Sequence, residues 1–492
     1  MGYLVGLDVG TTSCKAYALA PSGAVVAKTS RSYELSFGPG GRVEQDPEDW
    51  WLAVVSCLRE LTSKVSDVEA LSVSSQANTL VLLGDDRRPL GAAISWLDQR
   101  SASEVDEIVR EVGLSELRRR TGLMPGAGFT APKLLWASRR GLLAKARAVL
   151  FSPQSYVLLK LTGELVVDRT LASFSMLYDL RRGGWLPEVL ALVGLDEEAL
   201  PRLVESCDVV GSLREEVAAE VGLSPDTVVV AGAHDQCCAA LGAGLTGPGT
   251  VVDSAGTASA VMGVLDSLPD EIPGGLMCYH YLAPGRWTAL GTVSASGALL
   301  SWILKLAGMP GGHDALEARA RELSAGSDGV VVVPYFSGSF RPGVPHDARG
   351  AILGLTLGHG PHHLYRAALE ALAFEARFFV EAIKAAGGYV RLVVSVGGGA
   401  KSRLWREIKA NVLKVPVAKP VEADTAPLGA AILAGVGSRA FRNLSEGASK
   451  VVRVEEVVEP DRELAEAYDR LYREYLEVAA EASKLTAGLV PR

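Results

Sequence analysis

An acidic residue follows an apolar segment near the middle of the chain. The apolar run at 228–232 ends in glycine, and His234, Asp235 and Gln236 then come together ahead of an alanine-rich segment that favours a helix. Burying a carboxylate is unfavourable unless it is paired, bound to a metal or used as a base. Asp235 is therefore a candidate catalytic base, and the alternative is an aspartate that caps the following helix.

A strand at the start of the chain ends in the sequence DVGTT (8–12). A hairpin turn here offers backbone N–H groups and the hydroxyls of Thr11 and Thr12 to phosphate oxygens, while Asp8 can hold a hydrated Mg²⁺. The same letters also occur in ordinary β-turns. A second turn of this kind, AGTAS, presents Gly256 and Thr257 in the equivalent place, and the pair favours phosphate binding.

A glycine-rich segment, GGGA (397–400), lies between a predicted strand at 392–396 and a predicted helix. Such a loop can contact a phosphate or a ribose. It lacks the full GxGxxG spacing of a dinucleotide fingerprint, so a plain strand-to-helix turn remains the alternative.

Amide side chains are scarce, with only three Asn and five Gln in the chain, and four of these eight lie in three short segments. Amides donate and accept hydrogen bonds in pairs, which suits the vicinal hydroxyls of a sugar or polyol, and Trp96 can pack on its carbon face. The pattern predicts a neutral polyhydroxylated ligand. The alternative is that these are scattered turn residues: Gln76, Asn78, Gln99 and Gln236.

Strands and helices alternate along the whole chain, which predicts an α/β fold. The sequence VGLDVGTTSCKAYAL near the start is repeated in character by TVVDSAGTASAVMGVL near residue 250, which indicates a duplicated fold. We place the domains at 1–245 and 246–492, divided at a glycine-rich turn. Further elements are expected as strands at 3–10, 15–19, 24–28, 68–74 and 79–83 and as helices at 46–64, 361–386 and 459–485.

Composition excludes several classes of protein. The formal net charge of -8 over 492 residues opposes general attraction to nucleic acid or to an anionic membrane face. No apolar run approaches the roughly 20 residues needed to cross a bilayer, and no basic leader precedes an apolar stretch, so we expect a cytoplasmic protein. The six cysteines show no CxxC spacing, and His359, His362 and His363 are expected at a solvated helix start and not at a metal.

These pieces, in this order, resemble the FGGY family of carbohydrate kinases. GFTAPKLLW (128–136) is similar to the first family signature, and GAILGLTLGHGPHHLYRAALE (350–370) fits the second. The resemblance runs from about residue 3 to residue 436, and within the family it is strongest to xylulokinase-like pentulose and hexulose kinases. It implies two actin-like, ribonuclease H-like ATPase domains with ATP and the sugar in the cleft between them.

The resemblance also implies roles for individual residues. Asp235 matches the catalytic base, and Asp8 and Asp235 are the implied ligands of Mg²⁺. The implied contacts are Asp8, Thr11, Thr12, Gly256 and Thr257 for the phosphates of ATP, Gly398, Gly399 and Ser402 for adenosine, and Gln76, Asn78, Trp96, Asp98, His234, Asp235 and Gln236 for the sugar.

Three departures from the family pattern leave the sugar open. Gln76, Ala77 and Asn78 stand where xylulokinases have Gln-Met-His, SGSFRP (337–342) replaces an SGERTP loop, and Ala233–His234 replaces a pair that is often Gly-Gly. We expect a ketose substrate, D-xylulose or a related pentulose or hexulose. The alternatives are a glycerol or other polyol kinase, whose Arg-Glu pair is missing here, and an actin-like ATPase without a sugar acceptor. The sequence is compatible with a monomer or a homodimer.

Overall fold

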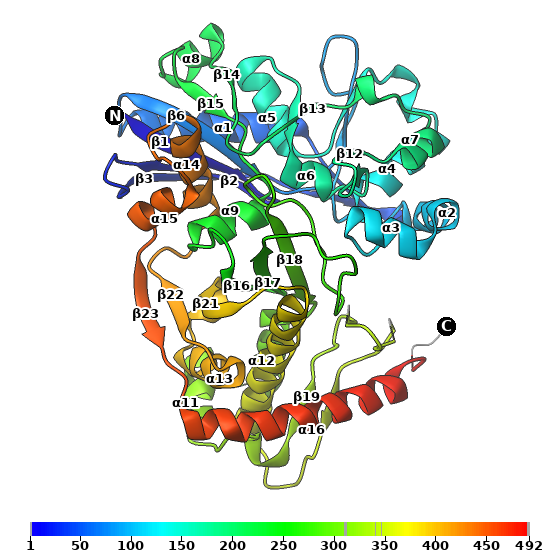
Figure 1. Ribbon diagram of the computed structural model, residues 1–492, viewed down its shortest axis with the longest axis vertical. Helices are drawn as coiled ribbons and strands as arrows, with labels where there is room; N and C mark the ends of the chain where they lie inside the picture. Colours follow the sequence, from blue (N-terminus) through cyan, green and yellow to red (C-terminus); the bar gives the residue numbers. More distant parts are fainter. Residues whose placement is uncertain (1, 309–311, 340, 346, 490–492) are drawn as a thin grey trace. The chain divides into compact units, whose positions relative to one another are not determined.

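The computed structural model describes residues 2–308, 312–339, 341–345 and 347–489. The chain forms two compact units, each containing a six-stranded sheet with helices packed on it (Figure 1). The first unit runs to Thr246 and also takes 278–288 and 424–452 from the second half of the chain. The second unit comprises 247–277, 289–423 and the residues from Arg453 onward. The predicted division into 1–245 and 246–492 uses one boundary, whereas the chain passes between the units several times.

The first sheet has the strand order β14-β15-β6-β1-β2-β3. The central strand β1 pairs antiparallel with β2 and parallel with β6, and β15 continues the parallel part. The predicted strands at 15–19, 24–28 and 68–74 are confirmed as β2, β3 and β6. The strands are β14 (Val209–Ser212), β15 (Val228–Val230), β6 (Val68–Ser75), β1 (Tyr3–Val9), β2 (Ser13–Leu19) and β3 (Val25–Ser32).

The second sheet repeats this plan in the order β18-β17-β16-β21-β22-β23. Strand β16 pairs antiparallel with β17 and parallel with β21, as β1 does with β2 and β6. The predicted duplication and the α/β class are therefore confirmed. The strands are β18 (Trp287–Val293), β17 (Ser259–Leu265), β16 (Gly249–Ala255), β21 (Val390–Val396), β22 (Val417–Pro420) and β23 (Val454–Val458).

The side chains of strand β1 alternate between the two faces of the first sheet, which are packed differently. Val5, Leu7 and Val9 are fully buried in the apolar cluster that also contains residues of helix α1, and each such burial contributes about 1.5 to 3 kcal/mol. Side chains alternate along a strand, so Gly6 and Asp8 share the other face. Asp8 is therefore directed away from the apolar cluster.

Glycines let one helix approach this other face closely and let a second helix pack against the first. A Cβ on Gly6 would lie 1.9 Å from the carbonyl oxygen of Pro427 in helix α14 (Ala426–Gly437), and a Cβ on Gly429 would lie 1.9 Å from the carbonyl of Cys238 in helix α9 (Asp235–Gly242). Helix α14 lies beside β1 although it is more than 400 residues away in sequence (Figure 1). This packing holds α9, which begins at Asp235, over the face of the sheet that carries Asp8.

The longer predicted helices are confirmed. Helix α1 begins with Asp46 as its N-cap, and the Asp46 carboxylate accepts a hydrogen bond from the Glu48 amide at 3.0 Å, as the sequence DPE indicates. The expected helices at 361–386 and 459–485 are α12 and α16. The helices of the first unit are α1 (Pro47–Thr62), α2 (Ala102–Val112), α3 (Leu114–Thr121), α4 (Thr130–Arg139), α5 (Pro153–Thr162), α6 (Arg169–Ser173), α7 (Pro187–Val193), α8 (Glu215–Val221), α9, α14 and α15 (Leu444–Val451). Those of the second are α10 (Gly297–Ala307), α11 (Gly312–Arg321), α12 (Pro361–Ala385), α13 (Arg403–Leu413) and α16 (Arg462–Thr486).

The strand expected at 79–83 is shorter in the structure, where β7 spans only Val81–Leu83. Asn78 adopts a left-handed backbone conformation with φ of 55°, so the chain turns there before the strand starts. The other short strands are β4 (Ser36–Gly38), β5 (Arg42–Gln45), β8 (Ala93–Ile94), β9 (Ala148–Leu150), β10 (Val166–Asp168), β13 (Arg202–Val204), β11 (Tyr178–Asp179), β12 (Gly184–Trp185), β19 (Val331–Val333) and β20 (Ala351–Leu353). Across the described ranges, the helices are all too short or too polar to span a bilayer.

Candidate functional site

Two carboxylates, Asp8 and Asp235, influence each other on the face of the first sheet that α14 and α9 cover. Asp8 lies in register with Ser74 of β6, whose hydroxyl donates to Asp8 Oδ1 at 2.8 Å. Burial, and next the negative charge of Asp235, raise the pKa of Asp8 to about 7. Lys15 also acts on Asp8, but its ammonium is engaged by Asp424 at 2.6 Å. Asp8 therefore faces like charge without an ion pair of its own to offset it.

This donor set fits a hydrated Mg²⁺. Carboxylate oxygens are the ligands that Mg²⁺ takes from proteins, usually one or two of them, with water and phosphate oxygens completing the octahedron. In the part of the chain that the structure describes, no group of three or more His, Cys, Asp and Glu could enclose a metal ion. A cation beside Asp8 and Asp235 would offset their repulsion, and it would keep coordination positions for water and a ligand.

His234 holds the carboxylate of Asp235 from the neighbouring position in the chain. Its Nε2 lies 3.1 Å from Asp235 Oδ1, and its ring stacks on Phe174 with centroids 4.8 Å apart. The His234 amide donates to the Thr170 hydroxyl at 2.9 Å, and that hydroxyl donates to buried Asp168 at 2.7 Å. Burial raises the pKa of Asp168 to about 6. Sequence reasoning missed Asp168 and Thr170, because nothing local marks them as the support for a segment some 65 residues away.

Gln76 belongs to a chain of amides that reaches the first phosphate turn. Its Nε2 donates to Gln45 Oε1 at 2.8 Å, and Gln45 Nε2 donates to the carbonyl of Thr11, also at 2.8 Å. Gln76 Oε1 is buried and accepts no hydrogen bond from the described residues. An unused buried acceptor is unfavourable, and a ligand hydroxyl would satisfy it. Gln45 was missed by sequence reasoning, because it stands alone at the end of the short strand β5.

Trp96 lies beside the same turn. Its indole N–H donates to the Thr11 hydroxyl at 3.1 Å, while 42% of the residue remains exposed. Thr12, the next residue, is exposed, and Gln236 is partly buried in the first turn of α9. The structure thus brings most of the predicted sugar-binding and phosphate-binding residues of the first unit to one region around Thr11 and Asp235.

Asn78 and Asp98 differ from the other predicted sugar ligands, because protein groups already occupy their side chains. Asn78 Oδ1 accepts from the amide and hydroxyl of Thr130 at 3.0 and 2.9 Å, and Nδ2 donates to the carbonyl of Phe174 at 2.9 Å. Asp98 accepts from the Val43 amide at 2.8 Å and from the backbone and guanidinium of Arg100. These hydrogen bonds suit residues that shape the site better than residues that bind a sugar.

The predicted nucleotide-binding residues of the second unit line one cavity of about 770 Å³. Gly256 and Thr257 line it from the turn after β16. The glycine-rich segment after β21, more than 130 residues later in the chain, also lines it. Gly399 is required there, because a Cβ would lie 2.3 Å from the ring of Trp405. The predicted lining residues are Gly256, Thr257, Gly398, Gly399 and Ser402, and sequence reasoning missed Ser301, His313, Asp314, Glu317, Tyr365 and Lys401.

A buried ion pair joins two elements next to this cavity. Asp253 of β16 pairs with Lys409 of α13, and both side chains are almost completely buried. The Lys409 ammonium also lies 3.8 Å from the ring centroid of Trp405, and the Ser402 hydroxyl accepts from the Trp405 amide at 3.0 Å as the N-cap of α13. The ion pair therefore ties the strand before the second phosphate turn to the helix after the glycine-rich loop.

Two further segments were singled out in the sequence. His363 lies at the start of α12, as expected, but the expectation of a solvated side chain is wrong for it. Its side chain is buried, because Nδ1 turns back to accept from the Gly360 amide at 2.9 Å. The segment SGSFRP at 337–342 includes Phe340, which lies outside the described residues, as does His346 in the loop that follows.

Comparison with known proteins places this geometry in a family. Residues 3–242 match the N-terminal domain of the FGGY family of carbohydrate kinases, and residues 251–438 match its C-terminal domain. The xylulose kinase of Bacillus subtilis (strain 168) is 30% identical over 496 residues and is covered to 99%, as is this chain. The crystal structure of xylulose kinase from Rhodospirillum rubrum superposes with a TM-score of 0.92 at 32% identity, covering 98% of this chain and 99% of that one. The crystal structure of gluconate kinase from Lactobacillus acidophilus gives 0.92 at 25% identity, with 99% of both chains covered. The chain belongs to the FGGY family of carbohydrate kinases.

Proposed function

We propose that this kinase transfers the terminal phosphoryl group of ATP to a hydroxyl of a ketose, with D-xylulose as the first candidate. The observation that carries the proposal is a partly exposed carboxylate, Asp235, whose charge helps to raise the pKa of buried Asp8. Gln76, with its unused amide acceptor, is bonded through its backbone to Val9, the residue after Asp8. Together these residues combine a base, a cation site and a hydroxyl-binding group. The 30% identity to a xylulose kinase over nearly the whole chain favours a ketose over other sugars.

Asp235 is the proposed base in this reaction. Its side chain is 30% exposed at the start of α9, so a substrate hydroxyl can reach it, and His234 orients its carboxylate. Phosphoryl transfer passes through a loose transition state, so alignment and charge neutralisation matter more than the strength of the base. Mg²⁺ held by Asp8 and Asp235 would supply that neutralisation when bound. Gln76, Trp96, His234 and Gln236 are the proposed sugar contacts.

ATP is the proposed phosphoryl donor. Thr11 and Thr12, and the corresponding turn of the second unit at Gly256 and Thr257, offer backbone N–H groups and hydroxyls to its phosphates. The cavity of the second unit is large enough for an adenosine and is bordered by glycines on two sides. Gly398, Gly399 and Ser402 are proposed to contact the adenosine there.

A polyol or sugar-acid substrate is the second candidate. The structural similarity to a gluconate kinase favours it, and an amide acceptor with an exposed indole suits any ligand with vicinal hydroxyls. An actin-like ATPase without an acceptor is a third possibility, which the buried, unused Gln76 oxygen disfavours.

A coupled assay of ADP formation tests the proposal. Purified protein is given MgATP with a panel of ketopentoses, ketohexoses, polyols and aldonates, and Asp235→Asn serves as the control for contaminating kinases. We expect ADP formation that depends on an added sugar, with the largest kcat/KM for D-xylulose. ATP consumption that is the same with and without every acceptor would contradict the proposal.

A further inference from the structure

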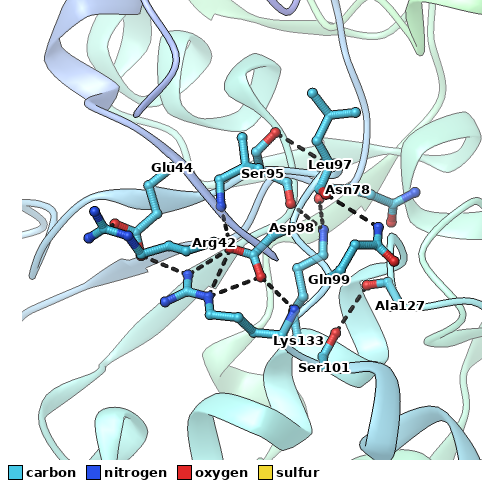
Figure 2. Close-up of polar contacts among 12 residues, drawn as sticks. Arg42, Glu44, Asn78, Ser95, Leu97, Asp98, Gln99, Ser101, Ala127 and Lys133 are labelled. Carbon is cyan, nitrogen blue, oxygen red and sulfur yellow. Dashed lines mark hydrogen bonds and ion pairs between the residues drawn. The ribbon is translucent and has the colours of Figure 1, made fainter. Parts of the chain in front are cut away.

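Lys133 of helix α4 is a buried cation in the first unit, and it lies next to two segments of the proposed sugar site. Its side chain is 1% exposed. The ammonium donates to the carbonyl oxygen of Asn78 and, at 3.1 Å, to the carbonyl oxygen of Ser95. Figure 2 shows the side chain reaching between these two segments. Neither acceptor is a carboxylate.

An ammonium in this position is unfavourable for stability. Burial lowers the pKa of Lys133 to about 7, and the neighbouring charge of Asp98 offsets this only in part. Asp98 itself is paired with Arg100 at 2.8 Å. An apolar side chain of similar volume would avoid this desolvation, so the lysine is better explained by what it holds in place than by stability.

The two carbonyls that Lys133 binds lie next to the side chains that reach Thr11. Asn78 follows Gln76 by two residues, and Gln76 connects through Gln45 to the carbonyl of Thr11. Ser95 directly precedes Trp96, whose indole N–H donates to the Thr11 hydroxyl. Both segments therefore run from Lys133 to the first phosphate turn, one through amides and the other through an indole.

Helix α4 strengthens the first of these connections. Thr130, one turn before Lys133, donates its amide and its hydroxyl to the side chain of Asn78. Residues three apart lie on the same face of a helix, so Thr130 and Lys133 hold Asn78 together. Asn78 adopts a left-handed φ, and its carbonyl accepts from Lys133.

We propose that Lys133 is a positioning residue of this kinase. It contacts neither substrate. By fixing the backbones at 78 and 95, it sets where Gln76 and Trp96 stand relative to the Thr11 turn, and so it places the sugar against the phosphoryl donor. Two N–H donors are enough for two carbonyls, so the neutral amine can do this as well as the ammonium. The inference rests on the proposed function, because it assigns Gln76 and Trp96 to the sugar.

Steady-state kinetics of Lys133→Met test the proposal. Methionine keeps most of the volume and removes the N–H donors. We expect kcat/KM for the sugar to fall at least tenfold, while KM for ATP changes less than twofold, because the proposed adenosine contacts lie in the other unit. Lys64→Met is the control. Lys64 is an exposed partner of Glu60 in the same unit, and its loss should leave both constants unchanged. A folded Lys133→Met variant with sugar kcat/KM within twofold of wild type, or with equal rises in both KM values, would overturn the proposal.

A double-mutant cycle with Trp96→Phe separates positioning from a general loss of stability. Lys133→Met should lower sugar kcat/KM by a clearly smaller factor in the Trp96→Phe background than in wild type, because one of its two connections to the Thr11 turn is already broken there. The same fold loss of sugar kcat/KM on Lys133→Met in both backgrounds would contradict the proposal. Should Lys133→Met fail to fold, Lys133→Leu, which also removes the N–H donors, takes its place with the same expected pattern and the same limits.

The wild-type measurement keeps the two claims apart. If wild-type protein forms ADP with a sugar and the Lys133 variants match it, the positioning role is wrong and the kinase proposal stands. If none of the acceptors tested raises ADP formation by wild-type protein above the rate without acceptor, both claims are wrong.

Discussion

The imidazole Nε2 of His234 lies 3.1 Å from the Oδ1 of Asp235, within hydrogen-bonding distance of the proposed base. The rest of His234 is held firmly, by stacking on Phe174 and by the bond from its amide to Thr170. His234 and Asp235, which are adjacent in the chain, therefore interact at the start of α9. His234 fixes the direction of a carboxylate that would otherwise rotate freely at a helix end.

His234→Ala should therefore lower kcat by about tenfold or more, since a misaligned catalytic group loses much of its effect. The affinity for ATP should be nearly unchanged. His359→Ala is the matched control, because His359 contacts Thr356 in its own loop and the ring of His363 in the second unit, and neither belongs to the proposed site. Rates are measured at saturating sugar and ATP, and a His234→Ala enzyme with wild-type kcat would remove His234 from the account.

Asp8→Asn should raise the Mg²⁺ concentration needed for half-maximal activity at least tenfold, because one of the two proposed carboxylate ligands becomes neutral. The same change should raise the thermal midpoint of the metal-free protein above pH 7. The sign follows from the pKa of Asp8, which burial and then the charge of Asp235 raise to about 7. Above that pH the folded chain must hold a buried charge that the unfolded chain holds in water, and Asn removes this cost. Activity titrations with Mg²⁺ and melting curves in EDTA measure the two effects, and an unchanged Mg²⁺ requirement would exclude Asp8 as a ligand.

Gln45→Ala should raise KM for the sugar by about tenfold, although Gln45 is not itself a proposed sugar contact. The substitution leaves Gln76 Nε2 without its acceptor, and a buried group left unpaired costs about 1 to 3 kcal/mol. Gln99→Ala is the control, because Gln99 is exposed and its side-chain amide donates to the nearby carbonyl of Leu97, whereas its backbone bond to Gly41 is kept in alanine. Equal KM values for both variants would show that the amide chain does not hold Gln76.

Lys409→Met should destabilise the second unit by about 3 to 5 kcal/mol, because it leaves the Asp253 carboxylate buried without a partner. Adding Asp253→Leu should restore much of the loss. Lys419→Met removes the partner of half-exposed Glu455 and should change the free energy of unfolding by no more than about 1 kcal/mol. The free energy of unfolding of the three variants is compared with that of wild type. A Lys409→Met protein as stable as wild type would contradict the structural role of the pair.

Lys133 should make the protein more stable as the pH rises from about 7 towards 10. Its pKa of about 7 lies below the value of 10.5 for a free lysine, so in this range the folded chain binds fewer protons than the unfolded chain. Lys133→Met removes this contribution. The difference in thermal midpoint between the two proteins, followed from pH 7 to 10, should therefore move in favour of wild type, and a constant difference would show that Lys133 is not perturbed.

Sequence alone predicted the parts of the site that lie within short segments. The turn DVGTT and its repeat at Gly256 and Thr257 could be found because each carries its chemistry within five residues. The same holds for His234 and Asp235, which stand together at the end of an apolar run.

The supporting contacts could not be predicted in this way, because they join residues that are distant in the chain. Gln45 meets Gln76 across 31 positions, and Lys133 meets Asn78 across 55. Asn78 shows that sequence alone can also suggest a ligand contact that the structure does not favour. Its scarcity as an amide drew attention to it, but only the structure shows that Thr130 and Phe174 already occupy its side chain.

Asp235→Asn is the most direct test of the central claim, that this carboxylate accepts the proton of the sugar hydroxyl. The amide keeps the shape of the side chain and cannot act as a base. ADP formation is measured with saturating sugar, and ATP binding is measured by calorimetry on the same preparation. The account predicts a kcat at least 10²-fold below wild type with ATP affinity within about threefold. A variant that phosphorylates sugar at the wild-type rate would contradict it.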